Sequence, residues 1–478
     1  MPPAPPPPRL GLFGIGLADY WPQFPGLEDR LRSYLSIVRE KLSGYGGEVV
    51  DLGLVDTTDK AFAAGTRART EDVDLLFLYV TTYALSGTVL PVVRRAGVPV
   101  VVLNLAPEAA IDYERFNALG DRTKMTGEWL AYCSACPVPE ISNVFGRAGI
   151  PFRQVTGMLH DDPVAWDEIR DYVEAARVVK TMAFNRLGLM GHYYGGMLDI
   201  YTDTTLQLAT FGGHFEIIEV DELAALRREI DDGVIQKRVA EFRDVFAVQP
   251  DCTEAELARA ARTSVALDQL VDRYRLGSLA YYYRGTGVAE NADTLSSIIL
   301  GNSLLTARNV PVAGEYEVKN AQAMKIMDTL GAGGSFTEFY AMDFAADVVL
   351  MGHDGPGHLT IAEGRARVKP LKVYHGKVGS GLSIEMSVAH GPVTLLSVIE
   401  QPGGGLALLV AEGESVPGPI LEIGNTNSRY RFPLGARGFV NAWNAAGPAH
   451  HCAVGVGHVA AKIEKVGSLL ELPVLKIC

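Results

Sequence analysis

Short apolar runs that alternate with helical patterns most constrain the fold of this chain. Residues 10–15 (LGLFGI), 74–80 (DLLFLYV) and 98–105 (VPVVVLNL) are continuous apolar runs of strand length. Residues 27–42 and 86–96, which lie between these runs, carry apolar residues at helical spacing. Such runs are typical of strands that are buried on both faces of a parallel sheet, and their alternation with helices predicts a doubly wound α/β domain.

The same alternation recurs further along the chain. Residues 186–191 (RLGLMG), 215–220 (FEIIEV) and 278–284 (SLAYYYR) are typical of strands, and helix-rich segments separate them. After Gly334, short alternating runs are punctuated by glycine and proline, as in a β-barrel or sandwich. The predicted fold class is therefore α/β, with two Rossmann-like or flavodoxin-like domains followed by an antiparallel β-barrel-like domain. The expected boundaries are 1–178 (with a proline-rich tail, 1–8), 179–331 and 332–478.

Composition argues against several classes of protein. The 478 residues carry 43 Lys and Arg against 56 Asp and Glu, a net charge of −13, which disfavours a broad nucleic-acid footprint. No apolar run approaches the roughly 20 residues of a membrane helix, and the start of the chain lacks the features of a signal peptide. Five sparse cysteines, including a lone CxxC at Cys133 and Cys136, indicate reduced thiols and no zinc site. We therefore expect a cytoplasmic protein that binds neither nucleic acid nor membrane.

The candidate chemistry is concentrated in residues 311–358 and near the end of the chain. Glu315 follows Ala-Gly, Glu338 lies in an apolar run, His353 precedes a Gly-Pro-Gly loop, and a His-His pair occurs much later, at 450–451. Each residue alone has a structural reading as a helix cap, a paired carboxylate or a solvated loop histidine. Together, two Glu and two His suit a hard or borderline cation such as Mn²⁺, Mg²⁺ or Co²⁺, and they can also move protons. GxSxG and HExxH motifs are absent.

Four short motifs resemble those of metal-dependent L-arabinose isomerase and, more distantly, L-fucose isomerase. They are Gly314-Glu315 with Lys319, 335–340 (SFTEFY), 350–353 (LMGH) and 449–451 (AHH). Weaker similarity covers most of the chain and includes Asp162-Pro163, 186–191 and Met197. The resemblance implies two α/β domains and a β-rich C-terminal domain, which agrees with the pattern above.

The resemblance also implies a metal site and a reaction. Glu315, Glu338, His353 and His451 would bind Mn²⁺, or Mg²⁺ or Co²⁺ in its place. Glu315 and Glu338 would be the catalytic acid/base pair of an aldose–ketose isomerase that acts through a cis-enediol. The family's assembly further implies a homo-oligomer, a trimer or hexamer, whose sites form between subunits.

The sugar is less defined than the reaction. The residues expected to contact it are His450, Met197, Trp21, Gln23 and Asp121. Leu119 stands where the family usually has a histidine, and residues 18–24 (ADYWPQF) replace its usual Gln-His pair. Two alternatives stay open: a catalytically silent sugar-binding or regulatory protein, and a metal-dependent epimerase or aldolase on the same scaffold. A binding protein would not need two carboxylates and two histidines together, so we favour the isomerase.

Overall fold

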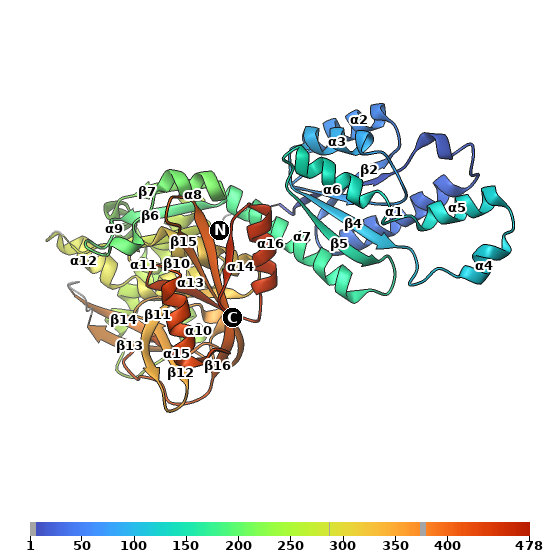
Figure 1. Ribbon diagram of the computed structural model, residues 1–478. Helices are drawn as coiled ribbons and strands as arrows, with labels where there is room; N and C mark the ends of the chain where they lie inside the picture. Colours follow the sequence, from blue (N-terminus) through green and yellow to red (C-terminus); the bar gives the residue numbers. More distant parts are fainter. Residues whose placement is uncertain (1–5, 286, 373–378) are drawn as a thin grey trace. The chain divides into compact units, whose positions relative to one another are not determined.

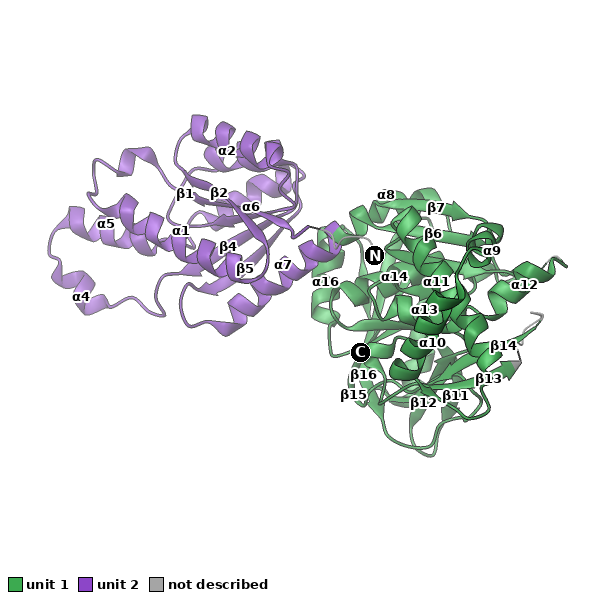
Figure 2. Ribbon diagram, turned by 180° about the vertical axis from the view of Figure 1, so that it is seen from behind, with its two compact units in different colours: residues 1–5, 181–478 green, residues 6–180 purple. Residues whose placement is uncertain are grey.

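The computed structural model describes residues 6–285, 287–372 and 379–478, and the chain divides into two compact units. One unit is Pro6–Lys180 and the other contains Thr181–Cys478 (Figure 2). The second unit holds both the second parallel sheet and the C-terminal sheet, so the expected three-domain division stays a prediction. Residues 1–5 of the predicted proline-rich tail lie outside the described residues.

The N-terminal unit is built on a five-stranded parallel sheet with the order β2-β1-β3-β4-β5 (Figure 1). This is the strand order of flavodoxin-like doubly wound sheets. Its strands are β1 (Arg9–Ile15), β2 (Glu48–Val55), β3 (Leu75–Tyr79), β4 (Val100–Ala106) and β5 (Phe152–Met158). Its helices are η1 (Ala18–Tyr20), α1 (Leu27–Gly44), α2 (Thr58–Thr70), α3 (Ser86–Ala96), α4 (Tyr113–Ala118), α5 (Arg122–Tyr132), α6 (Val138–Arg147) and α7 (Pro163–Phe184). The last turn of α7, residues 181–184, already belongs to the second unit.

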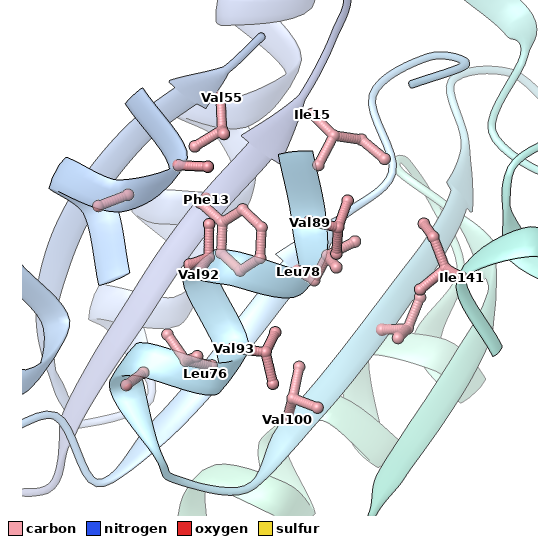
Figure 3. Packing of buried hydrophobic residues seen from close by; sticks show 14 of the residues in the cluster. Phe13, Ile15, Val55, Leu76, Leu78, Val89, Val92, Val93, Val100 and Ile141 are labelled. Atoms are coloured by element: carbon pink, nitrogen blue, oxygen red, sulfur yellow. The ribbon is translucent and has the colours of Figure 1, made fainter. Parts of the chain in front are cut away.

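The core on one face of this sheet explains why the apolar runs became strands. Phe13 of β1 and Leu76 and Leu78 of β3 are fully buried and pack with Val92 and Val93 of α3 (Figure 3). Residues of α2 and α6 complete the same cluster. Burial of such side chains stabilises the fold by about 1.5–3 kcal/mol each. The predicted α/β class and parallel sheet are confirmed for this unit.

One strand was missed by the sequence pattern. β2 has the sequence EVVDLGLV and lies at the edge of the sheet, where only three of its eight residues are buried. A register shift opposite Leu12 and Phe13 interrupts its pairing with β1, and Gly53 lies at this irregularity with φ of 78°. A half-polar edge strand with a bulge lacks the continuous apolar run that marks a central strand.

The second unit begins with another parallel sheet, ordered β10-β9-β6-β7. Its strands are β6 (Arg186–Gly191), β7 (His214–Ile218), β9 (Ser278–Tyr282) and β10 (Val312–Ala313). Its helices are η2 (Leu198–Ile200), α8 (Thr204–Phe211), α9 (Val220–Arg228), α10 (Asp232–Val245), α11 (Glu254–Tyr274), α12 (Ala289–Ser296), α13 (Ile299–Thr306) and α14 (Val318–Thr329). The second predicted α/β region therefore has the expected parallel sheet.

The C-terminal region contains a seven-stranded sheet with the order β15-β18-β11-β12-β17-β16-β19, in which β15 also pairs with β16. The sequence predicted an antiparallel barrel-like domain, but the sheet is mixed because β19 runs parallel to β16. Its strands are β11 (Gly333–Asp343), β12 (Val348–His353), β15 (Gly391–Glu400), β16 (Leu406–Val416), β17 (Thr426–Arg431), β18 (His451–Val456) and β19 (Val474–Lys476). The remaining helices here are η3 (Leu359–Ile361), α15 (Gly435–Ala445) and α16 (Ala460–Leu469).

A small third sheet joins distant parts of the second unit. β13 (Arg367–Lys372) pairs antiparallel with β14 (Ser380–Glu385) and parallel with the two-residue β8 (Ala247–Val248). No helix among the described residues combines the length and apolarity that a membrane span requires.

Candidate functional site

Three potential ligand atoms converge on one point in the second unit. One atom each of Glu315, His450 and His451 lies within 4.8 Å of the others. The Glu315 Oε2 atom is 3.8 Å from His450 Nε2 and 3.6 Å from His451 Nε2. On its other side, Glu315 Oε1 lies 4.0 Å from the Nε2 atom of His353. Glu315 therefore faces three imidazoles that the chain supplies from β12 and from the start of β18.

The turn that carries Glu315 has an uncommon backbone. Glu315 and Tyr316 follow β10 and both have positive φ, 55° and 63°. Left-handed backbone costs a residue other than glycine roughly 1–2 kcal/mol. Two hydrogen bonds hold the turn: Tyr316 N donates to Tyr281 O at 3.0 Å, and Glu317 N donates to Gly314 O at 3.0 Å. Strain of this kind is commonly retained where a side chain must be placed for function.

His451 is fully buried and is oriented by a buried carboxylate. Its Nδ1 atom forms a hydrogen bond with Glu317, and the two side chains are 0% and 1% exposed. Its Nε2 atom points toward Glu315 and has no hydrogen-bond partner among the described residues. A histidine whose Nδ1–H is held by a carboxylate keeps its Nε2 lone pair for a cation, which is how metal-binding histidines are usually arranged. The donor set therefore fits a divalent metal.

His450 has an equivalent partner in Asp199, which lies in η2. The Asp199 Oδ2 atom accepts hydrogen bonds from His450 N at 2.9 Å and from Nδ1 at 2.6 Å. Lys319 Nζ donates to Asp199 O at 2.5 Å and fixes the loop. Burial lowers the pKa of His450, but hydrogen bonds to Glu315 and Asp199 outweigh it and raise this pKa to about 9. Burial likewise raises the pKa of Asp199, and the hydrogen bonds from His450 outweigh this effect and lower it.

Phe336 of β11 packs the imidazoles together. Its ring, 1% exposed, lies edge-on to His353 with centroids 4.5 Å apart and tilted against His451 at 4.3 Å. The Nδ1–H of His353 is directed at Asp354 O, 2.8 Å away, so its Nε2 lone pair also faces Glu315. All three imidazoles thus present the same ring nitrogen to one carboxylate.

Glu338 lies beside this cluster and outside the closest group of three ligand atoms. It follows Phe336 by two positions on β11, so both side chains project from the same face of the sheet. It is half-buried, pairs in register with His451 of β18, and lines a hollow together with Asp199, Trp443 and His450. Its predicted roles as metal ligand and catalytic carboxylate stay predictions.

The predicted sugar contacts are divided between the two units. Met197 immediately precedes η2, so it lies on the loop that carries Asp199. Trp21, Gln23 and Asp121 belong to the N-terminal unit, where each has a local partner. Trp21 Nε1 donates to Asp56 Oδ2 at 2.8 Å, Gln23 Nε2 donates to Asp19 O at 2.7 Å, and Asp121 accepts from Lys124 N at the start of α5 at 2.8 Å. Their contact with a sugar stays a prediction.

Sequence reasoning missed Glu317 and Asp199. Glu317 is separated from its histidine by 134 positions, and Asp199 is separated from His450 by 251. Only the position of Glu317, two residues after Glu315 and directly before a helix, could have drawn attention to it. Asp199 carried no signal that distinguishes it from a solvated loop carboxylate.

The β-rich region matches a known family. Residues 333–473 match the L-arabinose isomerase C-terminal domain, a range that includes Glu338, His353 and both adjacent histidines. This part of the chain is therefore similar to the C-terminal domain of L-arabinose isomerases. No curated protein matches the chain.

A solved structure gives only a weak likeness. It is an ABC transporter periplasmic solute-binding protein from Actinobacillus succinogenes 130z with bound D-allose. The match has 10% sequence identity, covers 64% of this chain and 95% of that chain, and has a TM-score of 0.17. A likeness this low supports no argument about fold or function.

Proposed function

We propose that the whole chain belongs to the L-arabinose isomerase family and that it is a divalent-metal-dependent aldose–ketose isomerase. The observation that carries the proposal is the convergence of Glu315 with the Nε2 atoms of His353, His450 and His451. In each of these histidines, the other ring nitrogen is occupied by a hydrogen bond. A purely structural cluster would have no need to direct the Nε2 atoms of three imidazoles at one carboxylate.

The proposed metal ligands are Glu315, Glu338, His353 and His451, with Mn²⁺ as the expected ion. His450 is assigned to the sugar hydroxyls because its side chain is 36% exposed, against 10% for His353 and 0% for His451. When bound, the ion supplies Lewis acidity that favours charge on adjacent substrate oxygens.

The two glutamates are the proposed proton carriers. One carboxylate takes the proton from C2 of the open-chain aldose, and the C–H electron pair forms the C1–C2 double bond while the carbonyl oxygen gains a proton. The resulting cis-enediol loses its O2 proton as the carbon-bound proton returns to C1, which yields the ketose. Glu338 suits this role because it is half-buried and faces the hollow beside His450, where a substrate carbon can approach it.

A trimer or hexamer remains part of the proposal, with size-exclusion chromatography and light scattering as its test.

A sugar panel tests the function directly. Pentoses, hexoses and tetroses, as aldoses and ketoses, are incubated with the Mn²⁺-loaded protein and separated by chromatography, with an EDTA-treated sample in parallel. We expect interconversion of one aldose–ketose pair that EDTA abolishes and Mn²⁺ restores. In D₂O, proton transfer through solvent exchange places deuterium on C1 of the ketose and on C2 of the recovered aldose. A product altered only at C2, with no ketose, would instead indicate an epimerase, and no conversion of any sugar would contradict the proposal.

Matched variants test the residue roles. Glu315→Gln and Glu338→Gln should each lower kcat at least about 10²-fold, the usual contribution of a general acid or base. Glu464→Gln changes an exposed carboxylate on α16 in the same way and should leave kcat unchanged. Near wild-type kcat for both active-site variants would refute the acid/base pair, even if the protein isomerises a sugar.

A further inference from the structure

A second hollow lies in the same unit, next to the turn that follows His353. Its wall is formed by the end of β9, by α12, by the turn after β12 and by residues of β13 and β14. We name it the β9–α12 hollow after two of the elements that form its wall. The residues that line it include Tyr281, Tyr283, Arg284, Leu295 and Ser383. It shares no lining residue with the hollow at Glu338 and His450.

The lining of the β9–α12 hollow is mostly apolar and aromatic. Tyr281 and Tyr283 line it together with Leu295, Ile299 and Leu382. A free sugar carries a hydroxyl on almost every carbon and needs a polar partner for most of them when it is buried. This lining therefore suits a ligand with a flat or branched hydrocarbon body better than a free sugar. Most small-molecule pockets are lined in the same way, mainly by hydrophobic and aromatic side chains.

Two polar groups of the hollow suit a ligand with an anionic head. Ser383 is 0% exposed, and its Oγ atom has no hydrogen-bond partner among the described residues. Arg284 lies at the exposed rim and forms no ion pair with a carboxylate in the described part of the chain. Asp354 also lines the hollow, but it already interacts with other groups of the protein. A buried free hydroxyl and an unneutralised guanidinium both favour an oxygen anion.

We propose that the β9–α12 hollow is a binding site for an amphipathic organic anion, separate from the sugar site. The ligand has an aromatic or branched apolar body between Tyr283 and Leu295 and one carboxylate or sulfonate near Arg284. Nothing in this proposal requires the protein to be an isomerase.

The hollow adjoins the candidate metal site through one turn. Asp354 and Gly355 form part of its wall, and the backbone oxygen of Asp354 is the partner of His353 Nδ1. A ligand packed against this turn therefore bears on the orientation of His353. We extend the proposal to coupling: occupation of the hollow changes the affinity for Mn²⁺. This extension rests on the proposed metal site.

Binding is tested with 8-anilinonaphthalene-1-sulfonate (ANS), an aromatic monoanion whose fluorescence rises on apolar burial. We expect one saturable site on the folded protein. Ala292→Leu places extra carbon atoms in the hollow from α12 and should weaken ANS binding by more than about tenfold. Ala289→Leu makes the same change at an exposed position of the same helix and should leave ANS binding unchanged. Arg284→Gln should weaken ANS about fivefold, as expected for an exposed ion pair, and leave the uncharged probe N-phenyl-1-naphthylamine unaffected.

The outcomes separate this site from the proposed function. Equal ANS binding by wild type, Ala292→Leu and Arg284→Gln, with all three folded by circular dichroism, would overturn the proposal. Coupling is measured as the Mn²⁺ dissociation constant with and without saturating ANS, and we expect a change of at least threefold that Ala292→Leu abolishes. An unchanged constant would overturn the coupling alone. Absence of any Mn²⁺ binding would overturn the metal site and leave the ANS result standing.

Discussion

Replacing Glu317 with glutamine removes the negative charge behind His451 and keeps the size and an acceptor oxygen of the side chain. The Glu317 and His451 side chains are 1% and 0% exposed, so water cannot substitute for the lost charge. An outer partner of a metal-binding histidine typically contributes 10–100-fold to metal affinity, which corresponds to about 1.4–2.7 kcal/mol. We therefore expect Glu317→Gln to raise the Mn²⁺ dissociation constant by about this factor.

Isothermal titration calorimetry at pH 8 measures the effect where proton competition for the ligands is small. Glu464→Gln, an exposed carboxylate on α16, is the matched control and should bind Mn²⁺ as the wild type does. Because a neutral His451 leaves no unpaired buried charge, the metal-free variant should stay folded, which circular dichroism checks. A folded Glu317→Gln protein with a dissociation constant within twofold of the wild-type value would refute the assignment of Glu317 as the residue that orients His451.

Three further predictions address the metal, the aromatic support and the N-terminal unit. Mn²⁺ at 100 times its dissociation constant should stabilise the protein by about 2.7 kcal/mol. Thermal unfolding should show this as a higher melting temperature, and EDTA should reverse the rise. Phe336→Leu removes the ring that packs His353 and His451, so it should weaken Mn²⁺ binding in calorimetry while most apolar burial is kept; unchanged affinity would show that the ring only fills space. Glu140→Gln should destabilise the protein by about 1 kcal/mol at pH 7 in urea titrations. The N-cap residue of α3, Leu85, makes no side-chain hydrogen bond to the helix, and Glu140 Oε1 instead accepts from Ser86 N. This hydrogen bond lowers the pKa of Glu140, so its contribution is present above the ordinary pKa near 4.5 and is lost as pH falls through the lowered value. A difference in stability between wild type and Glu140→Gln that persists at pH 2 would show that it does not arise from the charged Glu140 carboxylate.

The parallel sheets could be predicted because their central strands carry their own signal. β1 and β3 are apolar at nearly every position, since both faces of each strand are covered. β2 gave no such signal because it is an edge strand with polar positions and a bulge. The mixed C-terminal sheet depends on β19, three residues at the end of the chain, whose direction is set by its pairing with β16. Local sequence cannot state with which strand, or in which direction, a short segment will pair.

The candidate site shows the same division. By itself, the sequence determined the kinds of donor atom available, Glu315, His353 and the adjacent histidines 450 and 451, because carboxylate and imidazole chemistry belongs to each residue alone. Only the tertiary structure decided which ring nitrogen of each histidine faces Glu315, because that depends on partners such as Asp199, 251 positions away. A hydrogen bond between distant segments exists only once the sheets and loops have packed, so the orientation of the donors is a property of the fold.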